Sequence, residues 1–495
     1  MSLDPRTPVI VGVGQVVERP HAEMDLVSRP SPSALMAAAL RAAVQDTGSR
    51  TTWDFDEMIA VNSVGWTSAD PALLVAAELG LDVRRTRKTP TGGDIPQRMV
   101  HDCARRILRG EIDSVALFGA EAIYTASRAH KSGVTLEWEI QPDSVAAAEM
   151  TSDETVPFSQ NELAAGLAWP TEFYPLFENA RRHRLGWSIA EQRERLGNLW
   201  ANFARVAESN PYAWITQAPS PAEIATPSPS NRYVGFPYTK FLVANLPVDM
   251  GAAIILTSLG EARRRGVASD QMVFPHFGAE GNDHWYVSER PALDDSVAMR
   301  RIWSALREFG TGADELAHLD LYSCFPTVVQ SAAEVIGIDA FDPSRVPTVT
   351  GGLTFAGGPG NNYVTHAISS MVTKLRDDPS SSGLVTGVGW FATKHAWGVY
   401  GSAPPTSPFS HRSVQAEVDA TATCATRQGD GRVSIESYVV MHSHDGSAKK
   451  LVVFGRFDDG TRVLARAKDV DLMARFECEE MIGVRATVSD GRLTI

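Results

Sequence analysis

Cysteine is scarce in this sequence, and its few copies do not form a pattern. The four residues Cys103, Cys324, Cys424 and Cys478 are widely separated in a chain of 495 residues. We therefore expect free thiols and a reducing, cytoplasmic setting, with neither a disulfide framework nor a metal site. A basic-then-apolar leader and apolar runs of membrane length are also missing, so no membrane association is expected.

An excess of positive charge is missing as well. The chain has 46 Lys and Arg against 59 Asp and Glu, which gives a formal net charge of −13. This balance argues against binding along a nucleic-acid backbone, because such binding needs a basic surface. The composition, 43% hydrophobic and 21% charged, is typical of a globular protein, and the length predicts two or three domains.

What the sequence does contain is a pattern of turn, helix and strand that occurs twice. The first copy starts at the Gly-Gly turn of Thr89–Gly93 and ends in the apolar run Val115–Phe118. The second copy starts at Thr348–Gly352 and ends in the apolar run 383–387. The number of residues between the two Gly-Gly turns is nearly the same as the number between two similar helices that precede them. Such a constant spacing predicts a duplicated unit. The matching upstream helices are expected at Pro71–Leu81 and Pro326–Ile338.

The helix after the first Gly-Gly turn is expected to be amphipathic, with Asp94 as its N-cap. Its buried face is predicted to carry Val100, Cys103, Ala104, Ile107 and Leu108. Its exposed face is predicted to carry Arg98, His101, Asp102, Arg105 and Arg106.

Strands and helices alternate in both halves, which predicts an α/β protein with mostly parallel sheets. Pro8–Val11 is expected to be the first strand, and Ser33 is expected to cap the helix that follows. Gly12 and Gly14 are expected to turn the chain. A dinucleotide site is disfavoured because the third glycine of that fingerprint is missing.

Two regions depart from this alternation. Residues 123–237 are rich in proline and serine and are predicted to be an inserted lid over the site, or else a solvated elaboration. Its arginines are interpreted as solvated helix faces: Arg181, Arg182, Arg184, Arg193 and Arg195. After residue 402 the apolar period becomes two, with Asp-Gly turns at 445–446, 459–460 and 490–491. This predicts a small antiparallel β-barrel, similar to an oligonucleotide-binding barrel, with five or six strands.

We accordingly divide the chain into halves 1–258 and 259–402 and a barrel domain 403–495. From residue 405 onward 12 Lys and Arg face 13 Asp and Glu, so the barrel is expected to bind no nucleic acid. A protein partner for the barrel stays open.

The duplicated units, the insertion and the stretch Pro237–Thr257, which contains Val-Asp-Met-Gly-Ala-Ala, together resemble the thiolase superfamily. The resemblance covers roughly residues 8–400 and is to the sterol-carrier-associated and acetyl-CoA acetyltransferase branches of this acyltransferase family. It implies a duplicated fold with αβαβα layers and coenzyme A thioesters as ligands. Relatives in this superfamily pair through the core sheet.

Each thiolase catalytic motif is altered in this sequence. The resemblance places the nucleophilic cysteine at Gly93 and the activating histidine of Gly-His-Pro at Gly358. The third motif reads Tyr322–Phe325 without its polar group, and the fourth, Thr386–Gly389, lacks its thiol. A cysteine thiolate and a neighbouring base are what the covalent mechanism requires. We therefore expect no ordinary thiolysis. Cys103 cannot replace the nucleophile, because it lies well inside a helix on the apolar face.

What remains is a glycine-rich pocket whose backbone N–H groups could hold a thioester oxygen. Its expected lining is Gly93, Gly351, Gly352, Gly357 and Gly358. Candidate bases, each of which also has a structural explanation, are Asp94, Tyr322, Tyr363 and His395.

Three functions are consistent with this pattern. The first is binding of CoA or acyl-CoA in lipid metabolism, without a covalently bound cofactor. The second is non-covalent C–C bond chemistry such as retro-aldol cleavage of an acyl-CoA. The third is an interaction subunit with a vestigial pocket.

Overall fold

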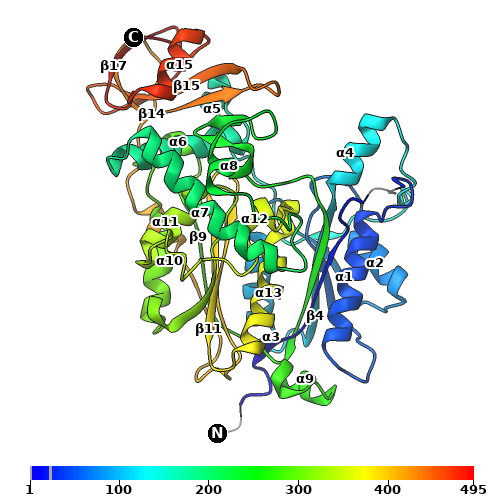
Figure 1. Cartoon of the computed structure of the whole chain (residues 1–495). Coiled ribbons are helices and arrows are strands. Elements are labelled where there is room, and N and C mark those ends of the chain that lie inside the picture. The colour runs from blue at the N-terminus through cyan, green and yellow to red at the C-terminus, as the bar shows by residue number, and fades with distance from the viewer. Residues whose placement is uncertain (1–2, 22–24) are drawn as a thin grey trace.

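The computed structural model describes residues 3–21 and 25–495, which form five layers and a barrel (Figure 1). Helices cover the outer face of each of two sheets, and two further helices lie between the sheets. This is the αβαβα arrangement that the resemblance implied, so the predicted fold class is confirmed. The barrel lies at one end of the layers, on the inserted region (Figure 1).

The first sheet belongs to the N-terminal half. Its strands are, in order, β1 (Pro8–Val17), β8 (Asp249–Ser258), β4 (Ser114–Ala122), β2 (Glu57–Ala60), β3 (Thr86–Lys88) and β5 (Glu149–Met150). The second sheet has the order β10 (Leu316–Asp320), β11 (Ser382–Gly389), β12 (Lys394–Gly401), β9 (Phe274–Asn282) and β13 (Ser410–Ser413).

Both sheets are mixed, so the prediction of mostly parallel sheets is correct only in part: three of the five strand pairs of the first sheet and two of the four of the second are parallel. β8 runs antiparallel to β1 and β4, and β12 runs antiparallel to β11 and β9. The reason is visible between β11 and β12, where residues 390–393 are too short for a crossover and form a hairpin connection.

The helices of the layers agree well with the apolar spacing in the sequence. The outer layers contain α1 (Pro32–Asp46), α2 (Pro71–Leu79), α10 (Val297–Glu308) and α11 (Pro326–Ile336). The central layer contains α3 (Ile95–Leu108) and α13 (Tyr363–Asp377). The short α9 (Leu259–Arg264) lies beside β1 and β8, and the short α12 (Gly352–Phe355) packs against α7. Among the residues described here, no helix combines the length and apolarity needed to span a membrane.

Two expectations for the N-terminal region were wrong. β1 continues through Gly12 and Gly14 without turning. A Cβ atom at Gly12 would lie 2.3 Å from Ala43 O, so the glycines let α1 approach the strand closely. The N-cap of α1 is Ser31, which accepts a hydrogen bond from Ala34 N at 3.2 Å, and not Ser33.

Helix α3 is more buried than its pattern predicted, because sheets cover it on two sides. Gln97 and His101 are 0% and 1% exposed. His101 was expected to face solvent, so this prediction was wrong. An amphipathic helix normally has one solvent-exposed face, but α3 lies in the central layer, where this face is covered as well.

The inserted region is largely helical. It contains β5 and, besides it, α4 (Ile123–Ser132), α5 (Gln160–Ala165), α6 (Pro170–Arg184), α7 (Ile189–Ser209), α8 (Pro221–Ala225) and β6 (Tyr233–Phe236), and β7 (Tyr238–Thr239) follows directly after it. The interpretation of its arginines as solvated was wrong at two positions. Arg181 donates to Ser331 Oγ at 2.7 Å and Arg182 to Glu480 Oε1 at 3.0 Å, and both side chains are buried. They are buried because α6 lies between the second half and the barrel.

The C-terminal barrel closes through five strands in the order β14-β15-β16-β18-β17, with β14 pairing again to β17. These are β14 (Gly431–His442), β15 (Ala448–Arg456), β16 (Arg462–Ala467), β17 (Arg485–Ser489) and β18 (Arg492–Thr494). Helix α14 (Gln415–Asp419) precedes the barrel strands, and helix α15 (Val470–Cys478) lies between β16 and β17. β6 of the inserted region pairs with β14 and extends the barrel sheet.

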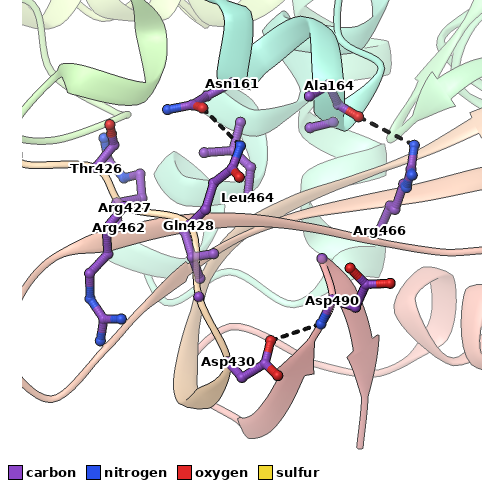
Figure 2. Close-up of a pocket in the computed structure, with 14 residues that line it drawn as sticks. Asn161, Ala164, Thr426, Arg427, Gln428, Asp430, Arg462, Leu464, Arg466 and Asp490 are labelled. Atoms are coloured by element: carbon purple, nitrogen blue, oxygen red, sulfur yellow. Dashed lines mark hydrogen bonds between the residues drawn. The ribbon is translucent and has the colours of Figure 1, made fainter.

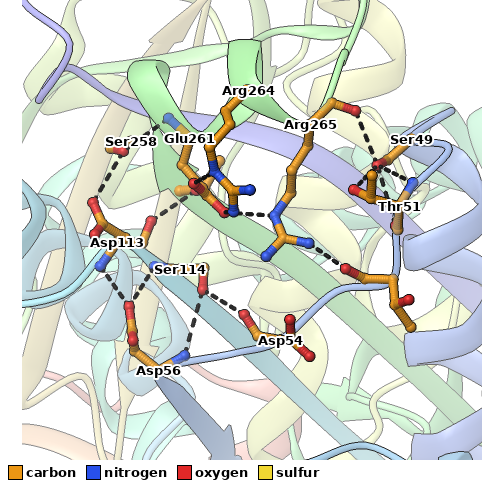
Figure 3. Close-up of polar contacts among 12 residues, drawn as sticks. Ser49, Thr51, Asp54, Asp56, Asp113, Ser114, Ser258, Glu261, Arg264 and Arg265 are labelled. Carbon is orange, nitrogen blue, oxygen red and sulfur yellow. Dashed lines mark hydrogen bonds and ion pairs between the residues drawn. The ribbon is translucent and has the colours of Figure 1, made fainter.

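A polar network closes the end of the first sheet beside α9 (Figure 3). Asp56 Oδ2 accepts hydrogen bonds from Asp113 N at 2.7 Å and Ser114 N at 3.2 Å. Arg265 donates to Glu261 Oε1 at 2.6 Å. These bonds satisfy the polar groups where β2 and β4 begin.

Candidate functional site

The first feature of the site is the close packing around Gly93, which lies in the turn between β3 and α3. A Cβ atom at Gly93 would lie 2.2 Å from Tyr322 Oη and 2.6 Å from Val388 O. Gly93 is buried, and Tyr322 is only 6% exposed. The Tyr322 hydroxyl therefore fills the volume that a nucleophilic side chain at residue 93 would need.

Asp94 lies next to this point and occupies the N-cap position of α3, as predicted, but its side chain does not supply the expected capping bond. It has helical backbone angles and makes no capping hydrogen bond. Its Oδ2 instead accepts from Arg98 Nε at 2.5 Å, and Oδ1 is buried without a hydrogen-bond partner among the residues that the structure describes. Cβ atoms at Gly92 and Gly389 would lie 2.6 and 2.2 Å from Oδ1, so two glycines leave room for the carboxylate.

Lys394 is a residue of the site that the sequence reasoning missed. It is 8% exposed, and its Nζ donates to Thr91 O at 3.0 Å. Burial lowers the pKa of this amine. The alternation of β12 could have indicated it, because neighbouring strand residues face opposite sides of a sheet. Lys394 therefore faces α3, and His395 faces away.

His395 is fully buried on that other face. Its Nε2 lies 3.0 Å from Ala392 O and 3.4 Å from Asp283 Oδ2. Of the four candidate bases, the structure brings together Asp94, Tyr322 and Tyr363 and places His395 apart from them.

Tyr363 is held in a buried hydrogen-bond network that supports the second Gly-Gly turn. Its hydroxyl donates to Asp320 Oδ1 at 2.9 Å, and its ring meets that of Tyr322 edge-on at 5.5 Å. Asp320 Oδ2 also accepts from Thr348 Oγ1 at 2.9 Å and from Val349 N at 3.0 Å. Burial raises the pKa of Asp320 above its usual range.

Several backbone amides of the glycines that were expected to line a pocket already have partners inside the protein. Gly351 N donates to Thr348 Oγ1, Gly352 N to Thr350 Oγ1 and Gly358 N to Asn245 O, each at 3.0 Å. A Cβ atom at Gly351 would lie 2.4 Å from the Ala207 side chain of α7, so the inserted region packs directly on this turn.

Neither the remaining predicted glycine nor the two buried cysteines of the layers, Cys103 and Cys324, supplies a nucleophile. Gly357 is buried, and a Cβ atom there would lie 2.5 Å from Met250 Sδ. Burial raises the pKa of Cys103 well above its usual value and that of Cys324 to about 12. Neither thiol is therefore ionised near neutral pH.

A cavity of about 440 Å³ lies elsewhere, between α5 and the barrel (Figure 2). Arg427 and Arg466 line it together with Asp430 and Asp490. Arg466 donates to Ala164 O at 3.2 Å. Its volume is within the range of small-molecule sites.

Comparisons with known proteins agree with this architecture. A crystal structure of a monomeric SCP2-thiolase-like protein type 1 from Mycobacterium smegmatis is 32% identical to this chain, covers 100% of both chains and gives a TM-score of 0.85. The family model described as the thiolase-like protein type 1 additional C-terminal domain matches residues 413–492. A comparison with curated proteins gave no match.

Two more distant structures share the fold over the layers. The Ltp2-ChsH2(DUF35) aldolase is 18% identical, with 80% of this chain and 98% of that chain covered and a TM-score of 0.58. Human mitochondrial 3-ketoacyl-CoA thiolase is 12% identical, with 81% and 100% covered and a TM-score of 0.57. The duplicated layers, the closed C-terminal barrel and the full-length match together show that this chain belongs to the SCP2-thiolase-like proteins of type 1.

Proposed function

We propose that this chain binds a coenzyme A thioester without forming a covalent bond to it and performs no thiolysis, in a role in lipid metabolism. The observation that carries the proposal is the Tyr322 hydroxyl in the space beside Gly93. A covalent acyl intermediate needs a nucleophile at that point. Family membership supports a thioester as the ligand.

The cavity between α5 and the barrel supports binding at a second place. Coenzyme A carries phosphate groups, and guanidinium groups such as those of Arg427 and Arg466 bind phosphate well. We therefore propose this cavity, which Asp430 and Asp490 also line, as a second place where a phosphate-bearing ligand binds (Figure 2).

A thiolysis assay with acetoacetyl-CoA tests the first part of the proposal, and turnover above the uncatalysed rate would contradict it. Calorimetry with CoA and acetyl-CoA tests the second part. Binding that weakens at least tenfold in the double variant Arg427→Gln, Arg466→Gln would support the assignment. No heat at millimolar ligand would favour an interaction subunit instead.

The charged group beside Gly93 supports a second candidate, non-covalent C–C bond chemistry. Asp94 Oδ1 is buried, unpartnered and close to the Lys394 amine. A carboxylate so placed could take the hydroxyl proton of a β-hydroxyacyl-CoA while the adjacent C–C bond breaks, and the resulting enolate would then be reprotonated. The shared fold of an aldolase is consistent with this chemistry.

A panel of β-hydroxyacyl-CoAs distinguishes the two candidates. Cleavage that is lost in Asp94→Asn and kept in His395→Gln would support the second. Unchanged substrate throughout would leave binding alone as the function.

A further inference from the structure

Three side chains from separate elements meet beside α3. His101 comes from α3, Glu280 from β9 and His411 from β13, the strand that leads into the barrel. His101 Nδ1 lies 3.0 Å and His411 Nε2 3.2 Å from Glu280 Oε2. One potential ligand atom from each residue lies within 4.8 Å of the others.

The ring of His411 is not satisfied by this carboxylate. Its Nε2 is buried and, within the described part of the chain, lacks a hydrogen bond of acceptable geometry, although Glu280 Oε2 is close. The side chain is 8% exposed. A buried polar nitrogen without a partner is costly and needs an explanation. An ion between the ring and the carboxylate would supply one.

The groups behind the cluster are arranged as supports of a metal site usually are. His101 Nε2 lies 2.9 Å from Gln97 Nε2, and Gln97 Oε1 accepts from Tyr400 Oη at 2.8 Å. Glu280 Oε1 accepts from Arg98 Nη1 at 3.1 Å, which leaves Oε2 free to face both rings. Such contacts fix ring orientation and ligand basicity. The Gln97 amide can rotate so that its oxygen accepts from a protonated Nε2 when Nδ1 binds an ion.

Space and access are also consistent with an ion. A Cβ atom at Gly278 would lie 2.4 Å from the His101 ring, so this glycine lets the ring reach the sheet. The Glu280 side chain is 17% exposed, which gives a route from solvent.

We propose that His101 Nδ1, Glu280 Oε2 and His411 Nε2 bind a divalent transition-metal ion of the zinc type. Two imidazoles and one carboxylate favour Zn²⁺ over Mg²⁺ or Ca²⁺, which prefer oxygen ligands. Ligands of a tetrahedral zinc ion lie about 3.3 Å apart, given Zn–N distances of about 2.0–2.1 Å. The two contacts to Glu280 are near this value. The ion would fasten β13, and with it the start of the barrel, to the central helix layer.

Titration of zinc into the metal-free, full-length protein tests the proposal. Calorimetry should give one equivalent per chain, and His411→Gln should weaken binding at least tenfold. His442→Gln is the matched control, because His442 is also a buried histidine, 2.9 Å from a single carboxylate of Glu477. This control should bind zinc as the unaltered protein does.

A second measurement uses only the unaltered protein, so it does not require that a variant folds. Cobalt(II) added to the metal-free protein should produce visible d–d absorption bands that one equivalent of zinc removes. Absence of these bands would overturn the proposal. So would zinc binding that is equally tight in a folded His411→Gln protein, since that result would place the ion on other histidines.

Discussion

At residue 93, where the resemblance to thiolases places the nucleophile, the chain has a glycine, and the Tyr322 hydroxyl occupies the volume that a side chain would need. Val388 O bounds the same space. Restoring a thiol therefore requires moving a buried tyrosine. We expect Gly93→Cys to gain no thiolysis in an assay with acetoacetyl-CoA.

The close contact between Gly93 and Tyr322 can be tested by measuring the free energy of unfolding of a variant with a larger residue at position 93. Gly93→Ala should lower the free energy of unfolding by about 1–3 kcal/mol, because the added methyl group overpacks the core. Urea unfolding measures this change. Gly312→Ala is the control, since the nearest atom to its Cβ would be 3.8 Å away. Equal stability of the two variants would contradict the prediction.

Glu121 provides a prediction about pH. It is 1% exposed, accepts hydrogen bonds from Val64 N and Gly65 N, and burial raises its pKa from 4.5 to about 7. Between these pH values the folded chain keeps the proton that the unfolded chain has released. Stability contributed by the protonated form is therefore lost as the pH rises through about 7, by on the order of 3 kcal/mol.

Glu121→Gln does not titrate, so its comparison with the unaltered protein isolates this effect. Between pH 5 and pH 8 the unaltered protein should lose stability relative to the variant in urea unfolding. A difference that stays constant across this range would show that the carboxyl does not retain its proton.

The contacts of single residues were harder to predict than their positions. Asp94 was correctly placed at the start of α3, but Arg98, one turn later, offers a charged partner that competes with the capping position. The meeting of His101, Glu280 and His411 could not be predicted, because their proximity depends on how a central helix and two strands pack.

At the scale of elements, the loop before α1 is joined to two distant elements by one buried side chain. Arg29 Nη2 donates to Asp249 Oδ2 at 2.6 Å, and its Nε donates to Thr125 Oγ1 at 3.1 Å. Asp249 belongs to the Val-Asp-Met-Gly-Ala-Ala stretch. The resemblance identified this stretch, and the ion pair gives its aspartate a physical role at the start of β8.

Arg29→Met should therefore be strongly destabilising. It leaves Asp249 charged and buried without its partner, for which a loss of about 3–5 kcal/mol is typical. Arg41→Met is the control, because the Arg41–Glu78 pair is 3.5 Å apart and about half exposed. Thermal unfolding should separate the two variants, with a change of about 0–1 kcal/mol for the control. Similar losses in both would argue against this role of Arg29.

Element positions were predicted well wherever one apolar period dominated. The helices at Pro71 and Pro326 and the barrel strands around the Asp-Gly turns are examples, because the apolar residues follow the helical repeat in the helices and alternate in the strands. Helix α15 was missed, because it is a short helix between barrel strands whose period of two dominates the region.

At the scale of the whole molecule, the barrel is built into the layers and is not a separate appendage. Val439, Val452 and Phe454 of the barrel belong to the same buried cluster as the inserted region and the second half. Arg462, fully buried, donates to Ser288 O at 2.6 Å and Arg290 O at 2.8 Å. These contacts join the barrel to the body by both apolar and polar groups.

A chain that ends at Ser402 should therefore not keep the native packing of the layers. We expect it to be poorly soluble or to bind the dye ANS strongly, because apolar residues covered by the barrel become exposed. ANS fluorescence and near-ultraviolet circular dichroism measure this against the full-length protein. A soluble fragment with native near-ultraviolet dichroism and no dye binding would show that the layers fold alone.

The pairing of β6 with β14 has a consequence for biosynthesis. Phe236 is matched with Val440, about two hundred positions later in the chain. At about 5–20 residues per second, a ribosome would deliver the later strand roughly 10–40 seconds after the earlier one. During that interval the nascent inserted region has an unpaired strand edge, so yield in a cell should depend on chaperones that shield it until translation ends.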